Sequence, residues 1–212
     1  MFVQEGIYKI EATKGAYAYV IQNEHGITMI DTFFPDKGEE ILSELKQAGL
    51  DRIDRILLTH TDFDHIGNME YIQAQTNCDI YIPAREQEAI DDPTKNKSRG
   101  ERRPFEGVTL PPMEILPEDG IAGITVIPAY GHSWGHTCYL FEGVLFAGDL
   151  VAEEDGKWVE LDLKYIRDHE ASLEAIKTVS DNYEFHLVCP THGEPIACTE
   201  IIVEGGGWLW NG

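Results

Sequence analysis

ILLTHTDFDHIGN, residues 56–68, joins an apolar run to a cluster of side chains that can bind metal. The run is rich in β-branched and other large apolar residues and predicts a buried strand. It ends in His60, Asp62, Asp64 and His65. Neutral imidazoles and carboxylates are common protein ligands of divalent transition metals, so this cluster indicates a candidate metal site.

Three further groups of polar residues follow apolar segments. AYGHSWGHT contains His132 and His136, LFAGDLV contains Asp149, and VCPTHGEP contains His192. In open α/β sheets, the loops at the carboxyl ends of the strands collect functional side chains. One such group alone is a weak signal, whereas four in this order favour a shared metal centre.

In this order the four groups resemble the metallo-β-lactamase-fold hydrolases, of which glyoxalase II is one type. The family has His-x-His-x-Asp-His after a strand, then a GHTxGH loop, an aspartate in GD and a histidine before glycine. HTDFDH, GHSWGH, AGD and THG match these elements, and the resemblance runs from about residue 15 to His192. It implies an α/β fold, a four-layer αβ/βα sandwich of two mixed β-sheets flanked by helices. Residues 1–212 would form a single domain.

The resemblance also implies a ligand set for two divalent metal ions. Three residues would bind each ion and one would bridge the pair: His60, Asp62 and His132; Asp64, His65 and His192; and Asp149 as the bridge. His136 matches a histidine that is usually structural in the family. We assign Asp31, in MIDT, to a structural role as well.

Asp62 departs from the family pattern, which has histidine at this position. Two histidines and one carboxylate suit iron, manganese or zinc. With both ions bound, three aspartates and a hydroxide would balance their charge, whereas the histidine version would keep one positive charge. A more neutral centre should acidify its water less or favour a harder metal. Two bound ions, one bound ion and a degraded site all stay open. We favour two bound ions, and retention of the other six ligand positions disfavours the degraded site.

The function implied by the resemblance is that of a metal-dependent hydrolase, with two zinc ions expected and iron or manganese as alternatives. A metal-bound hydroxide would attack the carbonyl of an ester, thioester or lactone bond in a small molecule. Asp64 is the candidate catalytic residue, which would orient the water or accept its proton. Two alternatives stay open. One is an iron-dependent oxidoreductase of the same fold, of the sulfur dioxygenase or diiron type, and the other is a non-catalytic, metal-poor binding scaffold.

The composition of the chain limits the classes of molecule that it is expected to bind. The 212 residues carry a formal net charge of −22, which disfavours binding to nucleic acids and to anionic membranes. We expect a small-molecule substrate. The sequence has no stretch of membrane-spanning length and no signal peptide at its start, so we expect a cytoplasmic location. The four cysteines have no CxxC spacing, and we interpret them as reduced, buried thiols.

Two segments stay open in interpretation. KNKSRGERR, residues 95–103, holds five bases and one acid, which fits either a clamp for an anionic substrate or a solvated loop. The tail GGGWLWNG, residues 205–212, fits either a docking segment or a tail that folds back. Trp134 and Tyr165 would line the pocket or pack against the core.

The pattern of apolar and turn residues predicts alternating strands and helices. Strands are expected over 17–22, 27–31, 52–59, 78–83, 123–129, 137–143, 144–149 and 185–190. Helices are expected over 35–49, 66–75, 84–90 and 168–183, the first of them capped by Asp36, and residues 91–113 predict a long loop.

Overall fold

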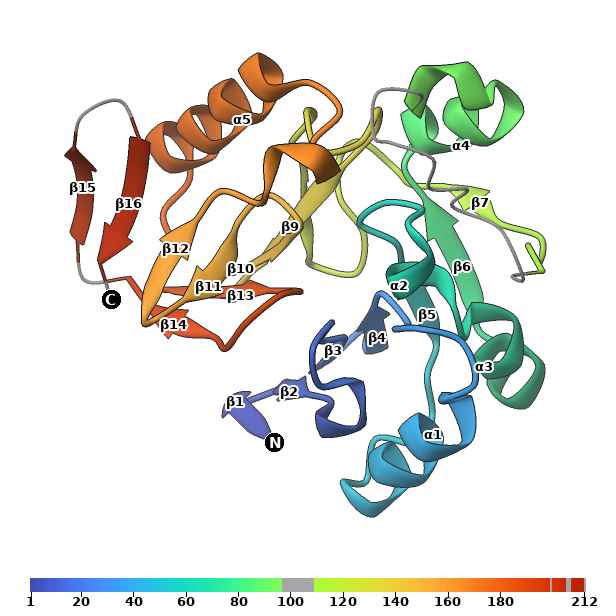
Figure 1. The fold of residues 1–212 in the computed structure, drawn as a ribbon. Helices are drawn as coiled ribbons and strands as arrows, with labels where there is room; N and C mark the ends of the chain where they lie inside the picture. Colours follow the sequence, from blue (N-terminus) through green and yellow to red (C-terminus); the bar gives the residue numbers. More distant parts are fainter. Residues whose placement is uncertain (97–108, 199, 205–206, 212) are drawn as a thin grey trace. The chain divides into compact units, whose positions relative to one another are not determined.

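The structure, a computed structural model, describes residues 1–96, 109–198, 200–204 and 207–211. The described chain forms two compact units, the first from residues 1–83 and 109–116 and the second from the remainder. Both units combine a mixed β-sheet with helices (Figure 1), which confirms the α/β fold class. The single domain expected for residues 1–212 stays a prediction.

The first unit is built on a seven-stranded sheet whose described strands lie side by side in chain order. They are β1 (Phe2–Gln4), β2 (Ile7–Lys9), β3 (Tyr19–Asn23), β4 (Gly26–Ile30), β5 (Arg55–Leu57), β6 (Asp79–Ile82) and β7 (Glu114–Ile115). The helices are η1 (Glu11–Thr13), α1 (Gly38–Gln47), α2 (Phe63–Ile66) and α3 (Met69–Thr76). The pairs from β1 to β4 are antiparallel, and those from β4 to β7 are parallel. The segments that follow β4 and β5 therefore leave the same edge of the sheet.

Helix α1 shows both a confirmed expectation and a wrong one. It buries Ile41 and Leu45 on one face, as predicted. The prediction that Asp36 caps it is wrong, because Asp36 has a left-handed backbone with φ of 66° and Lys37 occupies the N-cap position. The Lys37 N–H donates instead to Asn68 Oδ1 at 2.9 Å. Asn68, the N-cap residue of α3, thus fixes the entry to α1, and the local capping pattern carries no sign of it.

The second unit contains a five-stranded sheet and a four-stranded sheet among its described residues. In spatial order the first consists of β14 (Ile196–Ala197), β13 (Leu187–Pro190), β10 (Val144–Gly148), β9 (Thr137–Phe141) and β8 (Thr125–Pro128). The second consists of β11 (Ala152–Glu154), β12 (Lys157–Val159), β16 (Gly207–Asn211) and β15 (Glu200–Glu204). The helices are α4 (Ala84–Asp91), η2 (Pro93–Asn96), η3 (Leu163–Tyr165) and α5 (His169–Asn182). Only β10 and β13 pair in parallel among these strands, so the segments after them leave one edge together.

Helix α5 provides part of the core of the second unit. Ile176 and Val179 belong to one buried cluster with Leu145 of β10 and Val188 of β13. The side chain of Asp168 caps the helix, accepting from the Ala171 N–H at 3.2 Å. Cap and apolar face both agree with the helix predicted from the sequence.

The described part of the tail GGGWLWNG, residues 207–211, folds back within the second unit. Its β16 pairs antiparallel with β15 and β12, and the backbone of Trp210 pairs with that of Trp158. Of the two interpretations of this tail, the structure therefore favours the one in which it folds back.

The cysteines are thiols, three of them buried and Cys198 half-buried. Burial raises the pKa of the Cys198 thiol to about 11 and also raises the pKa of Cys138. Neither thiol is therefore ionised at neutral pH, which agrees with their interpretation as apolar packing groups. In the described part of the chain, no helix combines the length and the hydropathy needed to cross a membrane.

Tyr8 provides a pH test of the first unit. Its hydroxyl donates to Glu44 Oε1 at 2.9 Å, and burial together with the Glu44 carboxylate raises the pKa of Tyr8 to about 12. A raised pKa means that the protonated phenol favours the folded state. This stabilisation is complete below the ordinary pKa of about 10 and is lost as the pH rises towards 12. We expect Glu44→Gln to lower the pKa of Tyr8, measured by the ultraviolet absorbance of tyrosinate with Tyr8→Phe subtracted. An unchanged titration would contradict the assignment.

Candidate metal centre

The first cluster of candidate ligands follows β5, where the sequence predicts it. His60, Asp62, Asp64 and His65 lie in the segment between β5 and α3, and each side chain is at most 7% exposed. His60 Nε2 lies 3.5 Å from Asp62 Oδ2, and His65 Nε2 lies 4.0 Å from Asp64 Oδ1. The centroids of the two imidazole rings are 3.9 Å apart. Four donors of the predicted types thus converge within the first unit.

Asp31 orients one of these histidines. It follows β4 with φ of 56°, and its Oδ2 lies 2.8 Å from His65 Nδ1. The same carboxylate accepts from the Thr59 N–H at 2.8 Å and from the Thr59 hydroxyl at 2.7 Å. The carboxylate favours the tautomer in which Nδ1 carries the proton, so the lone pair of His65 lies on Nε2. The structural role predicted for Asp31 is therefore specific, since it orients His65, a candidate ligand.

Asp62 is placed as a ligand candidate rather than as a helix cap. It occupies the N-cap position of α2 with an extended backbone, φ −70° and ψ 149°, where aspartate commonly caps through its side chain. The Asp62 side chain makes no such cap bond. Its Oδ2 is turned towards His60 Nε2, and the residue is 5% exposed. The common structural reason for aspartate at a helix start does not apply here.

The second cluster lies in the second unit and is centred on Asp149, directly after β10. Asp149 Oδ2 lies 3.3 Å from His132 Nε2 and 3.4 Å from His192 Nε2. His132 comes from the loop between β8 and β9, and His192 follows β13, the parallel neighbour of β10. Asp149 and His132 are buried, whereas the His192 side chain is 33% exposed. One carboxylate oxygen facing two imidazole nitrogens fits a bridging metal ligand.

His136 has the structural role expected for it. Its Nε2 accepts a hydrogen bond from the Asp149 N–H at 3.0 Å, so its Nδ1 carries the proton and donates to the Ala129 carbonyl at 3.1 Å. Both ring nitrogens of this fully buried side chain are therefore bonded to the backbone. His136 fixes the backbone that presents Asp149, and it is not a ligand candidate.

The remaining sequence hypotheses have mixed outcomes. Lys97, Arg99, Arg102 and Arg103 lie outside the described residues, so the proposed basic clamp is not placed. Lys95 is described and lies over the Trp134 ring, with Nζ 4.5 Å from the ring centroid. Trp134 is half-buried in the loop that holds His132, so it does not simply pack in the core.

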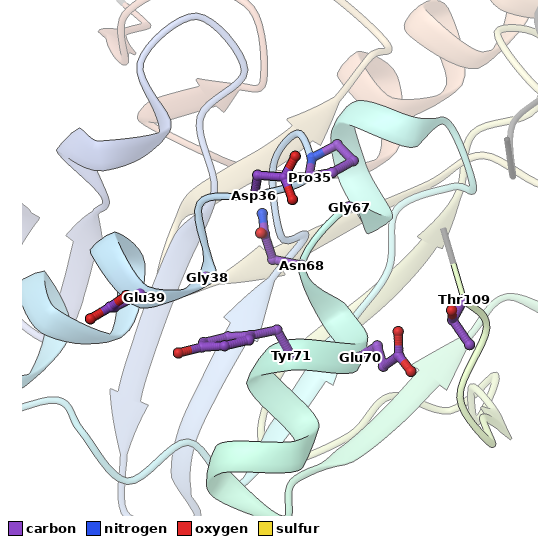
Figure 2. Close-up of a pocket in the computed structure, with 9 residues that line it drawn as sticks. All are labelled: Pro35, Asp36, Gly38, Glu39, Gly67, Asn68, Glu70, Tyr71 and Thr109. Carbon is purple, nitrogen blue, oxygen red and sulfur yellow. The ribbon is translucent and has the colours of Figure 1, made fainter. Parts of the chain in front are cut away.

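The first unit contains a pocket of about 380 Å³ (Figure 2). It is lined by Pro35, Asp36, Gly38, Glu39, Gly67, Asn68, Glu70, Tyr71 and Thr109. Its lining is acidic and contains none of the predicted metal ligands. This pocket does not correspond to the predicted centre.

Order and chemistry of the two clusters agree with the comparison to known families. A family model described as the metallo-beta-lactamase superfamily matches residues 13–192, which is most of the chain. The chain belongs to the metallo-β-lactamase superfamily. The match includes all seven predicted ligand positions. The assignment of these residues as ligands, and their union in one centre, stay predictions.

Individual members of the superfamily share less than a third of their aligned residues with this chain. A probable metallo-hydrolase of Methanocaldococcus jannaschii is 27% identical over 162 residues, which cover 73% of this chain and 76% of that protein. A hydroxyacylglutathione hydrolase of Methylobacillus flagellatus is 28% identical over 143 residues, 68% of this chain but 50% of that enzyme. The chain thus matches half the length of that hydrolase. Among solved structures, the BLEG-1 B3 metallo-β-lactamase is 27% identical with a TM-score of 0.70, covering 90% of this chain and 93% of that protein.

Proposed function

We propose that this superfamily member is a hydrolase that holds two divalent metal ions and cleaves an ester, thioester or lactone bond of a small molecule. The observation that carries the proposal is the convergence of His132 and His192 on one oxygen of Asp149, within 3.4 Å. The superfamily match and the metallo-hydrolase relatives support a metal-dependent hydrolase in general. The class of bond is our inference.

The residues of the two clusters fit the ions chemically, since the donors are imidazoles and carboxylates in buried surroundings. His60, Asp62 and His132 would hold one ion, Asp64, His65 and His192 the other, and Asp149 would bridge them. Bound ions would supply an activated water and an electrophile for the substrate carbonyl. Asp64, which is 5% exposed, would orient the water and accept its proton. Asp31 keeps the His65 lone pair on Nε2, and His136 fixes the backbone of Asp149.

Zinc is the proposed metal, because mixed histidine and aspartate ligands suit it and it needs no redox partner. We also propose a small-molecule substrate and a cytoplasmic location. The net charge of −22 supports the first, because it opposes binding to nucleic acids and anionic membranes.

A second candidate function is an iron-dependent oxidoreductase of the same fold. The observation that favours it is Asp62, whose carboxylate lies 3.5 Å from His60 Nε2. Two histidines and one carboxylate form a ligand set that also suits iron.

Metal analysis of the wild type and of Asp62→His tests the proposal. In protein purified without added metal, we expect about two zinc ions per chain, as in related dinuclear sites, and turnover of model esters or thioesters. In Asp62→His the centre gains one positive charge, which should acidify its water and move the acidic limb of the pH–rate profile to lower pH.

The control is Asp51→His, the same substitution at an exposed carboxylate of the first unit, which should change neither metal content nor pH profile. Iron in the purified protein together with oxygen uptake would contradict the proposed hydrolase and support the iron-dependent oxidoreductase. Absence of transition metal from both wild type and Asp62→His would leave the non-catalytic scaffold.

A further inference from the structure

Arg85 in the first turn of α4 packs against two aromatic rings. Its Cζ lies 3.9 Å from the ring centroid of Tyr130 and 4.0 Å from that of Trp134. Both rings come from the loop between β8 and β9 that carries His132. Stacking of this kind fixes the plane of a guanidinium but uses none of its N–H groups.

The N–H groups of Arg85 have no carboxylate or carbonyl partner among the residues that the structure describes. The two nearby acids of α4 bond to other donors. Glu86 is fully buried and accepts from the Ser133 hydroxyl at 2.6 Å and the Gly135 N–H at 2.7 Å. Glu88 accepts from Trp134 Nε1 at 3.1 Å and from Lys95 Nζ at 3.2 Å. A half-buried guanidinium held by rings while its neighbouring acids are occupied is arranged to bind an external acceptor.

Two more cations lie over the same indole. Lys95 Nζ and Arg167 Cζ are each 4.5 Å from the Trp134 ring centroid. Lys95 pairs with Glu88 and Arg167 lies 3.8 Å from Asp168, so each is partly balanced. The three cations Arg85, Lys95 and Arg167 are matched in number by the carboxylates of Glu86, Glu88 and Asp168, so the group has no excess of positive charge. An anionic ligand at this place would therefore be held by the N–H groups of Arg85 rather than by a general positive field.

The group is tied to the candidate ligand His132. The Arg167 N–H donates to the His132 carbonyl at 3.0 Å, and Trp134 follows His132 by two positions. Glu86 holds the residues on both sides of Trp134, and a Cβ at Gly135 would meet the Glu86 backbone nitrogen at 2.4 Å. The rings that hold Arg85 therefore have a fixed position relative to His132. An anion bound by Arg85 would therefore also be held at a fixed position relative to His132.

We propose that Arg85 binds a carboxylate of the substrate, so that the preferred substrate is a carbonyl compound with a carboxylate remote from the bond that breaks. This inference rests on the proposed hydrolase function. The planar fork of one guanidinium matches one carboxylate through two parallel N–H···O bonds. The partial pairing of Lys95 and Arg167 and the acidic chain disfavour a dianionic phosphate.

Turnover of two esters that differ in charge tests the proposal. With metal-loaded protein, kcat/KM is measured for mono-4-nitrophenyl glutarate and for 4-nitrophenyl valerate, which lacks the carboxylate. We expect the wild type to prefer the glutarate ester and Arg85→Gln to reduce that preference roughly tenfold to a hundredfold. Arg85→Lys should restore only part of it, because an ammonium has charge but no planar fork. The control Arg52→Gln removes an exposed guanidinium of the first unit and should leave the preference unchanged.

Calorimetric binding of glutarate to the same metal-loaded proteins separates this inference from the proposed function. If neither ester is hydrolysed, the proposed function fails, yet tighter binding of glutarate by the wild type than by Arg85→Gln still supports the carboxylate site. Equal binding by both proteins, or an unchanged ester preference, overturns it. Binding of methyl phosphate through Arg85 in place of glutarate overturns the assignment to a carboxylate. Arg85→Lys preserves the stacked cation. If Arg85→Gln does not fold, the comparison of the wild type with Arg85→Lys therefore still tests the proposal.

Discussion

Asp149→Asn is expected to abolish binding of one metal ion and to lower kcat/KM by at least about 100-fold. Loss of an outer partner of a metal ligand already costs about 10-fold to 100-fold in affinity or activity, and Asp149 is proposed as the bridging ligand itself. Its Oδ2 faces His132 Nε2 at 3.3 Å and His192 Nε2 at 3.4 Å. Asparagine has nearly the same shape but no charge, so repulsion between two nearby cations would no longer be offset.

The measurements are metal content after gel filtration and ester turnover at saturating added zinc. Asp155→Asn is the matched control, because it makes the same change at an exposed carboxylate of the second unit. Asp155 has φ of 52°, a conformation that asparagine tolerates, so its fold should persist. Full metal content and full activity in Asp149→Asn would remove the basis for the bridging role.

The sequence predicts the parts of the fold that depend on local periodicity and caps. The apolar run before His60 forms β5, and the face of α5 with Ile176 and Val179 lies in the core. The capping role of Asp168 is equally local and was predictable. These features need only neighbours within a few positions, which is the range that a sequence pattern describes.

Short strands that depend on distant partners were missed. β11 and β12 have three residues each and join β16, which lies far along the chain. Their turn contains Asp155 and Gly156, both with positive φ, and the Asp-Gly pair is a recognised hairpin signal. That signal was available, but the charged residues around it show no strand alternation. Three-residue strands give a periodicity too short to detect.

The candidate site likewise has a part that the sequence predicts and a part that it does not. Its donor side chains follow from motifs, whereas the groups that orient them do not. Asp31 contacts His65 across 34 positions, and Arg85 meets Tyr130 and Trp134 across a still longer stretch of sequence. No spacing rule joins such residues, because the fold alone brings them together. The sequence offered Asp31 only as a buried acid and gave no signal for Arg85.

Asp31→Asn is expected to weaken metal binding at the ion held by His65 by about 10-fold to 100-fold while leaving the fold intact. The amide keeps Oδ1 as acceptor for the Thr59 N–H but can place an NH₂ where Oδ2 now faces His65 Nδ1 at 2.8 Å. His65 would then accept at Nδ1 and carry its proton on Nε2, the nitrogen needed for the metal.

Two measurements check this tautomer argument: competition for zinc with a chromophoric chelator, and nitrogen chemical shifts of the His65 ring in the metal-free protein. Asp36→Asn is the control, since Asp36 is exposed and also has a left-handed backbone, with φ of 66°. Asp31→Ala instead leaves buried partners of the carboxylate unsatisfied, and each costs about 1–3 kcal/mol in the free energy of unfolding. Asp31→Asn therefore tests the orientation of His65 without the loss of stability that is expected for Asp31→Ala. If Asp31→Asn bound zinc as tightly as the wild type, with Nδ1 still protonated, Asp31 would not orient this ligand.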